Sequence, residues 1–269
     1  MSGLLDVSRS DSVTTIRMNR PPVNALTVEL QEELVERLGS VAEESETRVV
    51  ILTSGIERYF MAGADIKMMG GEDGFDRENP ATLERIAQMS RRSQAALTQI
   101  EHFPKPLIAA INGHALGGGC ELALVCDYRM MIDDGRSTIG LTEVSLGLIP
   151  GAGGTQRLPR LIGQARATEM IFEAQRLKAP DALRIGLVNA AVPAENFQAA
   201  VSERAAVLAR SAPIALRLAK EAIIAGMERA PGKAYEVEAE NFGRTAMTED
   251  AAIGIMSFVA KQKPEFGGR

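Results

Sequence analysis

Residues 106–127 read PLIAAINGHALGGGCELALVCD and place a strand, a glycine-rich turn and a helix in direct succession. The apolar run at 107–112 (LIAAIN) is typical of a buried strand. Residues 113–119 hold a cluster of glycines and predict a turn, residues 121–125 predict a helix, and residues 128–132 predict the next strand. Strands that alternate with helices in this way indicate an α/β fold with crossover connections.

The same alternation extends toward the N-terminus. The predicted elements there are strands near 4–8 and 13–18, a helix capped by Thr27 and running to about Glu44, a buried strand at 48–53, and a long helix from Pro80 to about His102. After about Ala194 the pattern changes, and helix follows helix over 195–262. We therefore expect a core, residues 1–194, that carries the functional site. The remaining helical region, residues 195–269, is expected to pack on a neighbouring subunit.

Composition excludes several classes of function. The chain has 269 residues, 45% of them apolar, with a net charge of -5. This balance favours neither a nucleic-acid surface nor a membrane surface, and no uncharged apolar run approaches the roughly 20 residues of a membrane span. The two cysteines form no CxxC pair, which favours a reducing compartment, and the N-terminus has no signal-peptide pattern. We expect a cytoplasmic protein.

Two glutamates stand alone in apolar surroundings. Glu121 is the only charged residue in 115–126, and Glu143 is the only one in 137–156. A carboxyl group held in an apolar setting tends to have a raised pKa, which suits general acid/base catalysis. The plain alternative is that such a glutamate points to solvent or pairs with a distant arginine. Glycine clusters at 117–119 and 151–154 favour the functional interpretation, because glycines let a ligand approach backbone N–H groups closely.

Other catalytic patterns are missing from the sequence. There is no GxSxG, HExxH, Walker A or GxGxxG pattern, and no Ser/His/Asp triad can be placed. The two histidines, His102 and His114, are expected to be structural or surface residues. We expect no metal and no cofactor. Arg91 and Arg92 are expected on a solvated helix face rather than in a nucleic-acid site.

Several ordered motifs across nearly the whole chain resemble the crotonase (enoyl-CoA hydratase/isomerase) superfamily. They are MNRPPVNALT at 18–27, FMAGADIK at 60–67, the stretch at 106–127, GLTEVSLGLIPGAGGTQRLPRLIG at 140–163 and TEDAAIGIMSFVAKQKPEF at 248–266. The resemblance implies a spiral of β-β-α units, followed by C-terminal helices that form trimers, which often stack as hexamers.

The resemblance also implies a site and a reaction. The backbone N–H groups of Ala64 and Gly118 would form an oxyanion hole for a thioester oxygen. Glu121 and Glu143 match the catalytic pair of the family's hydratases, which add water across the C2=C3 bond of a trans-2-enoyl-CoA. Glu121 would act as base toward the water, Glu143 would govern the proton delivered to C2, and the N–H of Gly151 would help hold the water. The commonest setting of this reaction is fatty-acid β-oxidation.

An acyl-CoA thioester is therefore the expected partner, with coenzyme A as part of the substrate rather than a cofactor. The residues matched to its binding are Val23, Ala25, Asp65, Ile66, Lys67, Phe258 and Lys261. The last two often reach coenzyme A from a neighbouring subunit. For the two lysines, plain surface solubility is the alternative.

Three departures from the family pattern bear on substrate choice. Leu141-Thr142 precede Glu143 where many hydratases have Gln-Pro, and Leu141 offers no hydrogen bond. A two-residue insertion before Glu143 is expected in a turn at 133–135. Met61 occupies a position where smaller residues are frequent, so it is a candidate to shape the acyl pocket. The open alternatives are an enoyl-CoA isomerase, an RNA-binding homologue and a catalytically silent subunit.

Overall fold

The structure, a computed structural model, describes residues 3–64 and 79–269. In this part of the chain the strands form two sheets, a six-stranded sheet in the order β1-β2-β3-β5-β7-β9 and a three-stranded sheet in the order β4-β6-β8. All neighbouring strands are parallel except β1 and β2. The strands are β1 Leu5–Ser10, β2 Val13–Met18, β3 Val49–Ser54, β4 Tyr59–Met61, β5 Leu107–Ile111, β6 His114–Leu116, β7 Tyr128–Asp133, β8 Ile139–Gly140 and β9 Ala190–Pro193.

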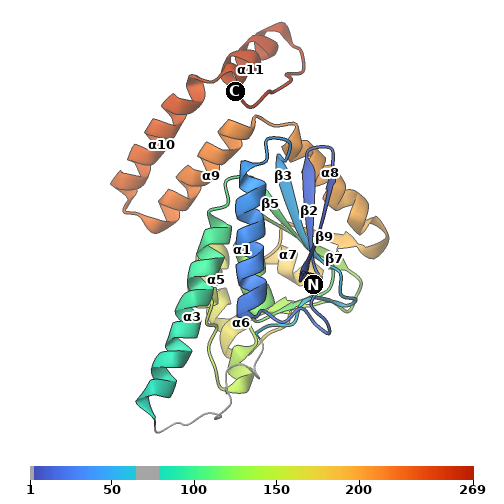
Figure 1. The fold of residues 1–269 in the computed structure, drawn as a ribbon, viewed down its shortest axis with the longest axis vertical. Helices are drawn as coiled ribbons and strands as arrows, with labels where there is room; N and C mark the ends of the chain where they lie inside the picture. The colour runs from blue at the N-terminus through green and yellow to red at the C-terminus, as the bar shows by residue number, and fades with distance from the viewer. Residues whose placement is uncertain (1–2, 65–78) are drawn as a thin grey trace.

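Helices cover these sheets and extend beyond them (Figure 1). They are α1 Val28–Glu43, α3 Pro80–Glu101, α4 Gly118–Leu124, α5 Gly154–Ile162, α6 Gln164–Phe172, α7 Ala179–Arg184, α8 Phe197–Ala209, α9 Pro213–Glu228, α10 Pro231–Ala246 and α11 Glu249–Ala260, with 3-10 turns η1 Glu143–Leu146 and η2 Ala194–Asn196. Thr27 caps α1 as expected, because its hydroxyl accepts the Leu30 N–H at 3.3 Å. No helix in the described ranges is long and apolar enough to cross a membrane.

The chain repeats a β-β-α unit. In β3-β4-α3, β5-β6-α4 and β7-β8-α5, the first strand joins the large sheet and the second joins the small sheet. Each unit adds one parallel strand to both sheets, so the chain advances as a spiral. The predicted α/β fold, a crotonase-type spiral of β-β-α units with helices at its C-terminal end, is confirmed.

Two predicted boundaries around the second unit were wrong. The segment 113–119, expected as one glycine-rich turn, contains strand β6, whose Ala115 is fully buried. Helix α4 begins at Gly118 rather than at Glu121. Glycine has a low intrinsic helix propensity, but Gly119 lies so close to β4 that a β-carbon there would come within 2.3 Å of the Met61 carbonyl oxygen. Close packing against β4 therefore outweighs the local preference.

The central strands of the large sheet are buried on both faces, whereas the edge strand β1 is largely exposed. One face packs in a cluster with α1, α3 and α4, and the other packs against α8 through Phe197, Val201 and Ala205. Helix α8 thus lies with the core, although the sequence suggested that the helical region begins at residue 195. Helix α9 is joined to the sheet region by the ion pair of Lys220 with Asp127 at 3.0 Å. Helices α10 and α11 stand farther from the sheets (Figure 1), and α10 packs mainly on α9.

Candidate active site

The candidate site lies at one edge of the small sheet. Its three strands are parallel, so their carboxyl ends meet at the same edge. Ala64 follows β4, Gly118 follows β6 and Glu143 follows β8. Three sequence motifs that are far apart in the chain are therefore brought together by the repeat.

The two predicted oxyanion-hole residues lie side by side. A β-carbon on Gly118 would come within 3.5 Å of the Ala64 nitrogen and 2.9 Å of the Leu26 side chain, so only glycine fits there without displacing a neighbour. Gly118 is the first residue of α4, and the N–H groups of a first helical turn have no partner within the helix. Ala64 is aligned by a β-bridge to Leu26, whose N–H donates to the Gly63 carbonyl oxygen at 2.8 Å.

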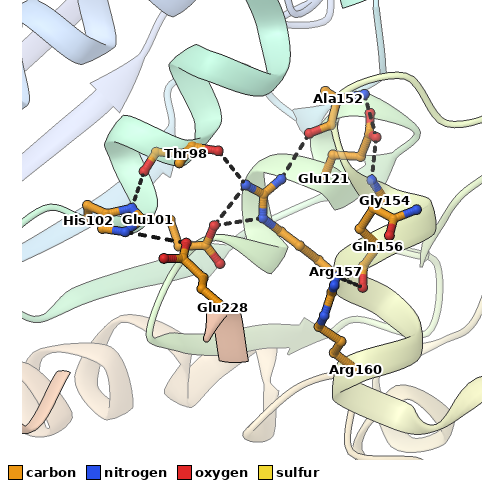
Figure 2. Close-up of polar contacts among 10 residues, drawn as sticks. All are labelled: Thr98, Glu101, His102, Glu121, Ala152, Gly154, Gln156, Arg157, Arg160 and Glu228. Carbon is orange, nitrogen blue, oxygen red and sulfur yellow. Dashed lines mark hydrogen bonds and ion pairs between the residues drawn. The ribbon is translucent and has the colours of Figure 1, made fainter. Parts of the chain in front are cut away.

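Glu121 is buried and held by backbone donors. Its side chain projects from the first turn of α4, and the residue is 3% exposed. Its Oε1 accepts the N–H groups of Ala152 and Gly154, both at 2.8 Å, at the N-terminus of α5 (Figure 2). Burial raises the pKa of Glu121, while the two N–H donors and the positive charge of Arg157 act in the opposite direction.

Glu143 lacks comparable support. It opens η1, and its Oε2 is buried with no hydrogen-bond partner in the described part of the chain. Burial, followed by the negative charge of Glu121, raises the pKa of Glu143 to about 7. Gly117 lies next to both glutamates, because its carbonyl oxygen accepts the backbone N–H of Glu121 at 3.0 Å and a β-carbon on it would lie 3.0 Å from Glu143 Oε1.

The loop that carries Gly151 is tied to α3. The Gly151 carbonyl oxygen accepts the Ser90 hydroxyl at 2.6 Å and the Gln94 side-chain amide at 3.0 Å. These contacts fix the loop from which Ala152 and Gly154 reach Glu121. The water-holding role of Gly151 stays a prediction.

One residue that sequence reasoning missed organises the loop of Val23 and Ala25. Asn24 is fully buried with a positive φ of 51°, and its amide donates to the Met18 and Phe60 carbonyl oxygens and to the Ser54 hydroxyl. The hydrogen bonds of Asn24 also position its two neighbours, Val23 and Ala25. The Val23 carbonyl oxygen accepts the Ala62 N–H at 3.1 Å, and Ala25 is buried. An asparagine between two apolar residues after a proline pair was the available signal.

The other residues matched to coenzyme A fall into two groups. Asp65, Ile66 and Lys67 lie outside the described residues. Phe258 and Lys261 belong to α11 and its C-terminal cap, which stand away from the sheets within the protomer (Figure 1), and Phe258 is 84% exposed.

The structure gives the positions of the three features that depart from the family pattern: Leu141, the turn at Asp134 and Met61. Leu141 is fully buried next to Glu121: a β-carbon on Gly154 would lie 2.9 Å from the Leu141 side chain and 3.0 Å from Glu121 Oε1. Leu141 thus contributes apolar surroundings to Glu121 rather than a hydrogen bond. Asp134 forms the predicted surface turn, where its carboxylate accepts the N–H groups of Arg136 and Ser137. Met61 is fully buried in β4, and its contact with an acyl chain stays a prediction.

The histidines take no part in this cluster. His102 pairs with Glu228 at 3.5 Å on the surface, and His114 contacts the Thr138 hydroxyl at 3.0 Å. Among residues 3–64 and 79–269, no group of His, Cys, Asp and Glu has the arrangement of a metal site.

Comparison with known proteins places the chain in a family. The model of the enoyl-CoA hydratase/isomerase family matches residues 8–269. A short-chain-enoyl-CoA hydratase from Clostridium acetobutylicum is 38% identical over 96% of this chain and 95% of its own length, and a 2,3-dehydroadipyl-CoA hydratase from Escherichia coli is 39% identical over both full lengths. A crystal structure of an enoyl-CoA hydratase from Bacillus anthracis aligns with a TM-score of 0.87 at 40% identity, covering 99% of this chain and 100% of that one. The protein belongs to the enoyl-CoA hydratase/isomerase family.

Proposed function

We propose that this protein is an enoyl-CoA hydratase that adds water across the C2=C3 bond of a trans-2-enoyl-CoA to give a 3-hydroxyacyl-CoA. The observation that carries the proposal is the pair of buried carboxyl groups with unequal partners. Glu121 accepts two N–H groups, whereas Glu143 Oε2 accepts none from the described residues. An ionised base and a neutral acid in one site are what addition of water requires.

The hydrogen bonds support a division of roles. Donors that point at Glu121 favour its ionised form, so Glu121 takes a proton from the water as the water oxygen bonds to C3. Glu143, with a pKa of about 7, is the group that carries the extra proton and gives it to C2. The carboxyl groups exchange protonation states in one turnover and are reset by proton exchange. Gly151 is proposed to help hold the water through its N–H.

The electron pair of the double bond passes to the thioester oxygen as water adds. The N–H groups of Ala64 and Gly118 are proposed to stabilise this enolate-like oxygen. Loss of one such donor typically costs about 10²–10³-fold in kcat. No cofactor is proposed, because the two carboxyl groups and the N–H donors would supply the chemistry of the reaction. Coenzyme A enters as part of the substrate.

A homotrimer, or a hexamer of two stacked trimers, is proposed as the working form. Apolar side chains that the protomer leaves exposed on α10, α11 and the turn between them are Tyr235, Phe242, Met247, Ile255, Met256, Phe258 and Val259. Exposed apolar groups of this extent mark association surfaces. Within such an assembly, Phe258 and Lys261 would reach the coenzyme A bound to a neighbouring subunit, whereas Val23, Ala25, Asp65, Ile66 and Lys67 would bind it within one subunit.

Fatty-acid β-oxidation is the proposed setting. The relatives named for short-chain and for dehydroadipyl substrates leave acyl length to be decided by assay. Cys120 and Cys126 are buried free thiols, which supports a reducing compartment such as the cytoplasm.

The test is an assay series on trans-2-enoyl-CoA thioesters of increasing chain length. Hydration removes the absorbance of the conjugated thioester, and the account predicts rapid loss with at least one chain length. A parallel assay with 3-enoyl-CoA measures isomerisation, which would produce that absorbance. Isomerisation without hydration would replace the hydratase proposal with the isomerase alternative, and acyl-CoA binding without either reaction would favour a silent subunit.

A further inference from the structure

Arg157 lies beside the loop that holds Glu121 and is largely buried. It projects from α5, its side chain is 15% exposed, and it is surrounded by residues of α3 (Figure 2). Its Nε donates to Glu101 Oε2 at 2.9 Å and its Nη2 donates to the Thr98 hydroxyl at 3.1 Å. The guanidinium group is thus fixed to α3 in one orientation.

The remaining arm of the guanidinium group acts on the backbone that holds Glu121. Arg157 Nη1 donates to the Ala152 carbonyl oxygen at 3.0 Å, and the Ala152 N–H donates to Glu121 Oε1 at 2.8 Å. Both polar backbone groups of Ala152 are therefore held, one by Arg157 and the other by Glu121 (Figure 2). A chain of three contacts connects α3 to the proposed base.

Gly153 shows that the close approach of Arg157 is built into the loop. Its φ of 110° favours glycine, and a β-carbon on it would lie 2.1 Å from Arg157 Nη1. Any side chain at 153 would displace the guanidinium group. The loop therefore has the backbone conformation and the space that this arginine requires.

We propose that Arg157 is a positioning residue for the hydration reaction, which holds the 151–154 loop so that both N–H groups meet Glu121 Oε1. This inference rests on the proposed function. Its charge also favours the ionised form of Glu121, in the same direction as the N–H donors. Without Arg157, Glu121 loses alignment and charge stabilisation together, although Arg157 itself touches no substrate.

The site also permits chemical rescue. Arg157 and Arg160 line an open cavity of about 760 Å³, together with Gln94, Gly153, Leu161 and Met227. Removal of the Arg157 side chain would leave a space connected to this cavity. Guanidinium ion from solution can then occupy the place of the missing group.

The experiment compares Arg157→Ala, Arg157→Lys and the control Arg160→Ala. Arg160 is an exposed arginine one turn further along α5 that donates to the Gln156 carbonyl oxygen. Misplacement of a catalytic group by about 1 Å can cost about 10²-fold, so we expect Arg157→Ala to lose about that factor in kcat with little change in KM. Removing groups that favour ionised Glu121 raises its pKa, so the acidic limb of the kcat profile should move to higher pH. Arg157→Lys keeps a charge but lacks the planar fork, and should recover only part of kcat.

Guanidinium chloride at non-denaturing concentration should raise kcat of Arg157→Ala at least tenfold relative to equal ionic strength of NaCl, and should leave Arg160→Ala unchanged. Wild-type kcat and pH profile in Arg157→Ala would overturn the proposal, as would a loss of kcat with neither a pH shift nor rescue. If Arg157→Ala does not fold, Glu101→Gln, which loosens the same guanidinium group, must show the pH shift.

Infrared titration of the Glu121 carboxyl band, assigned with Glu121→Gln, measures the pKa of Glu121 directly. An unshifted band in Arg157→Ala contradicts the inference even where no hydration occurs, so its failure is distinct from failure of the proposed function.

Discussion

Glu121 and Glu143 both lie next to Gly117, whose carbonyl oxygen accepts the Glu121 backbone N–H at 3.0 Å and on which a β-carbon would lie 3.0 Å from Glu143 Oε1. The two carboxyl groups share one apolar site but have different partners. The carboxylate of Glu121 accepts the N–H groups of Ala152 and Gly154. The pKa of Glu143 is raised by burial and by the negative charge of Glu121. Burial raises the pKa of both carboxyl groups, and the two N–H donors oppose that rise at Glu121. This difference supports the proposed opposite proton-transfer roles of the two residues.

The hydration rate should fall as the pH rises through about 7. Glu143 has a pKa of about 7 and must be protonated to deliver a proton to C2. In Glu121→Gln the neighbouring negative charge is removed, so the pKa of Glu143 should decrease. Initial rates at saturating substrate between pH 5 and pH 9 report the first effect, and infrared titration of the Glu143 carboxyl reports the second. A kcat that stays constant across pH 6 to 8 would remove Glu143 as the acid.

The same raised pKa predicts a stability effect. Because the folded state holds a proton on Glu143 more tightly than the unfolded state, the free energy of unfolding falls as pH rises from about 4.5 to about 7. Glu143→Gln does not lose this stability, because its side chain does not ionise. Its free energy of unfolding should exceed that of wild type at pH 8 by at most about 3 kcal/mol, and the difference should vanish near pH 4. Urea unfolding at both pH values measures it, with the exposed Glu203→Gln as control. Equal stability of wild type and Glu143→Gln at pH 8 would contradict the raised pKa.

Gly118→Ala should separate catalysis from binding. Its β-carbon would come within 2.9 Å of the Leu26 side chain, and because Leu26 is bridged to Ala64, a shift of Leu26 would disturb the Ala64 N–H beside Gly118. We expect kcat to fall by about 10²-fold with a small change in KM. Gly39→Ala is the matched control, because Gly39 lies on the exposed face of α1 and nothing lies within 4 Å of its β-carbon. It should leave activity unchanged and stabilise the protein by up to about 1 kcal/mol. Full activity of Gly118→Ala would refute the proposed oxyanion hole.

Asn24→Leu should weaken substrate binding and the fold together. It removes the hydrogen bonds from the Asn24 amide to Met18, Ser54 and Phe60. The Met18 carbonyl oxygen keeps the Gly55 N–H at 2.8 Å, and any buried group left unsatisfied costs about 1–3 kcal/mol. The loop of Val23 and Ala25 would move, so KM for acyl-CoA should increase more than kcat falls. Steady-state kinetics and thermal unfolding test both effects. An unchanged KM would contradict a role of this loop in coenzyme A binding.

Much of the fold could be predicted from the sequence because its long elements carry strong local patterns. Thr27 marks the start of α1, and the apolar run after Pro106 marks β5. Strands β6 and β8 have three and two residues, too few for a periodic pattern, and they form because the repeat pairs β6 with β4 and β8 with β6. Short elements of this kind are defined by tertiary contacts rather than by propensity.

The site was predictable to the extent that charge is conspicuous in an apolar stretch. Glu121 and Glu143 stand out in this way, and the glycines beside them indicate close backbone approach. Asn24 offered one local signal and Arg157 none, because the contacts that define their roles include partners far along the chain, Ser54 at 30 residues from Asn24 and Thr98 at 59 residues from Arg157. Their roles depend on three-dimensional contacts that no local spacing encodes.

The central claim is that two carboxyl groups hydrate one double bond together. The most direct measurement is the loss of enoyl-thioester absorbance on crotonyl-CoA with wild type, Glu121→Gln, Glu143→Gln and the double variant. The account predicts rapid loss with wild type and a fall of several orders of magnitude in each single variant. The double variant should lose little more, because groups that act as a unit are not additive. Rapid hydration by either single variant, or none by wild type on crotonyl-CoA and longer chains, would contradict it.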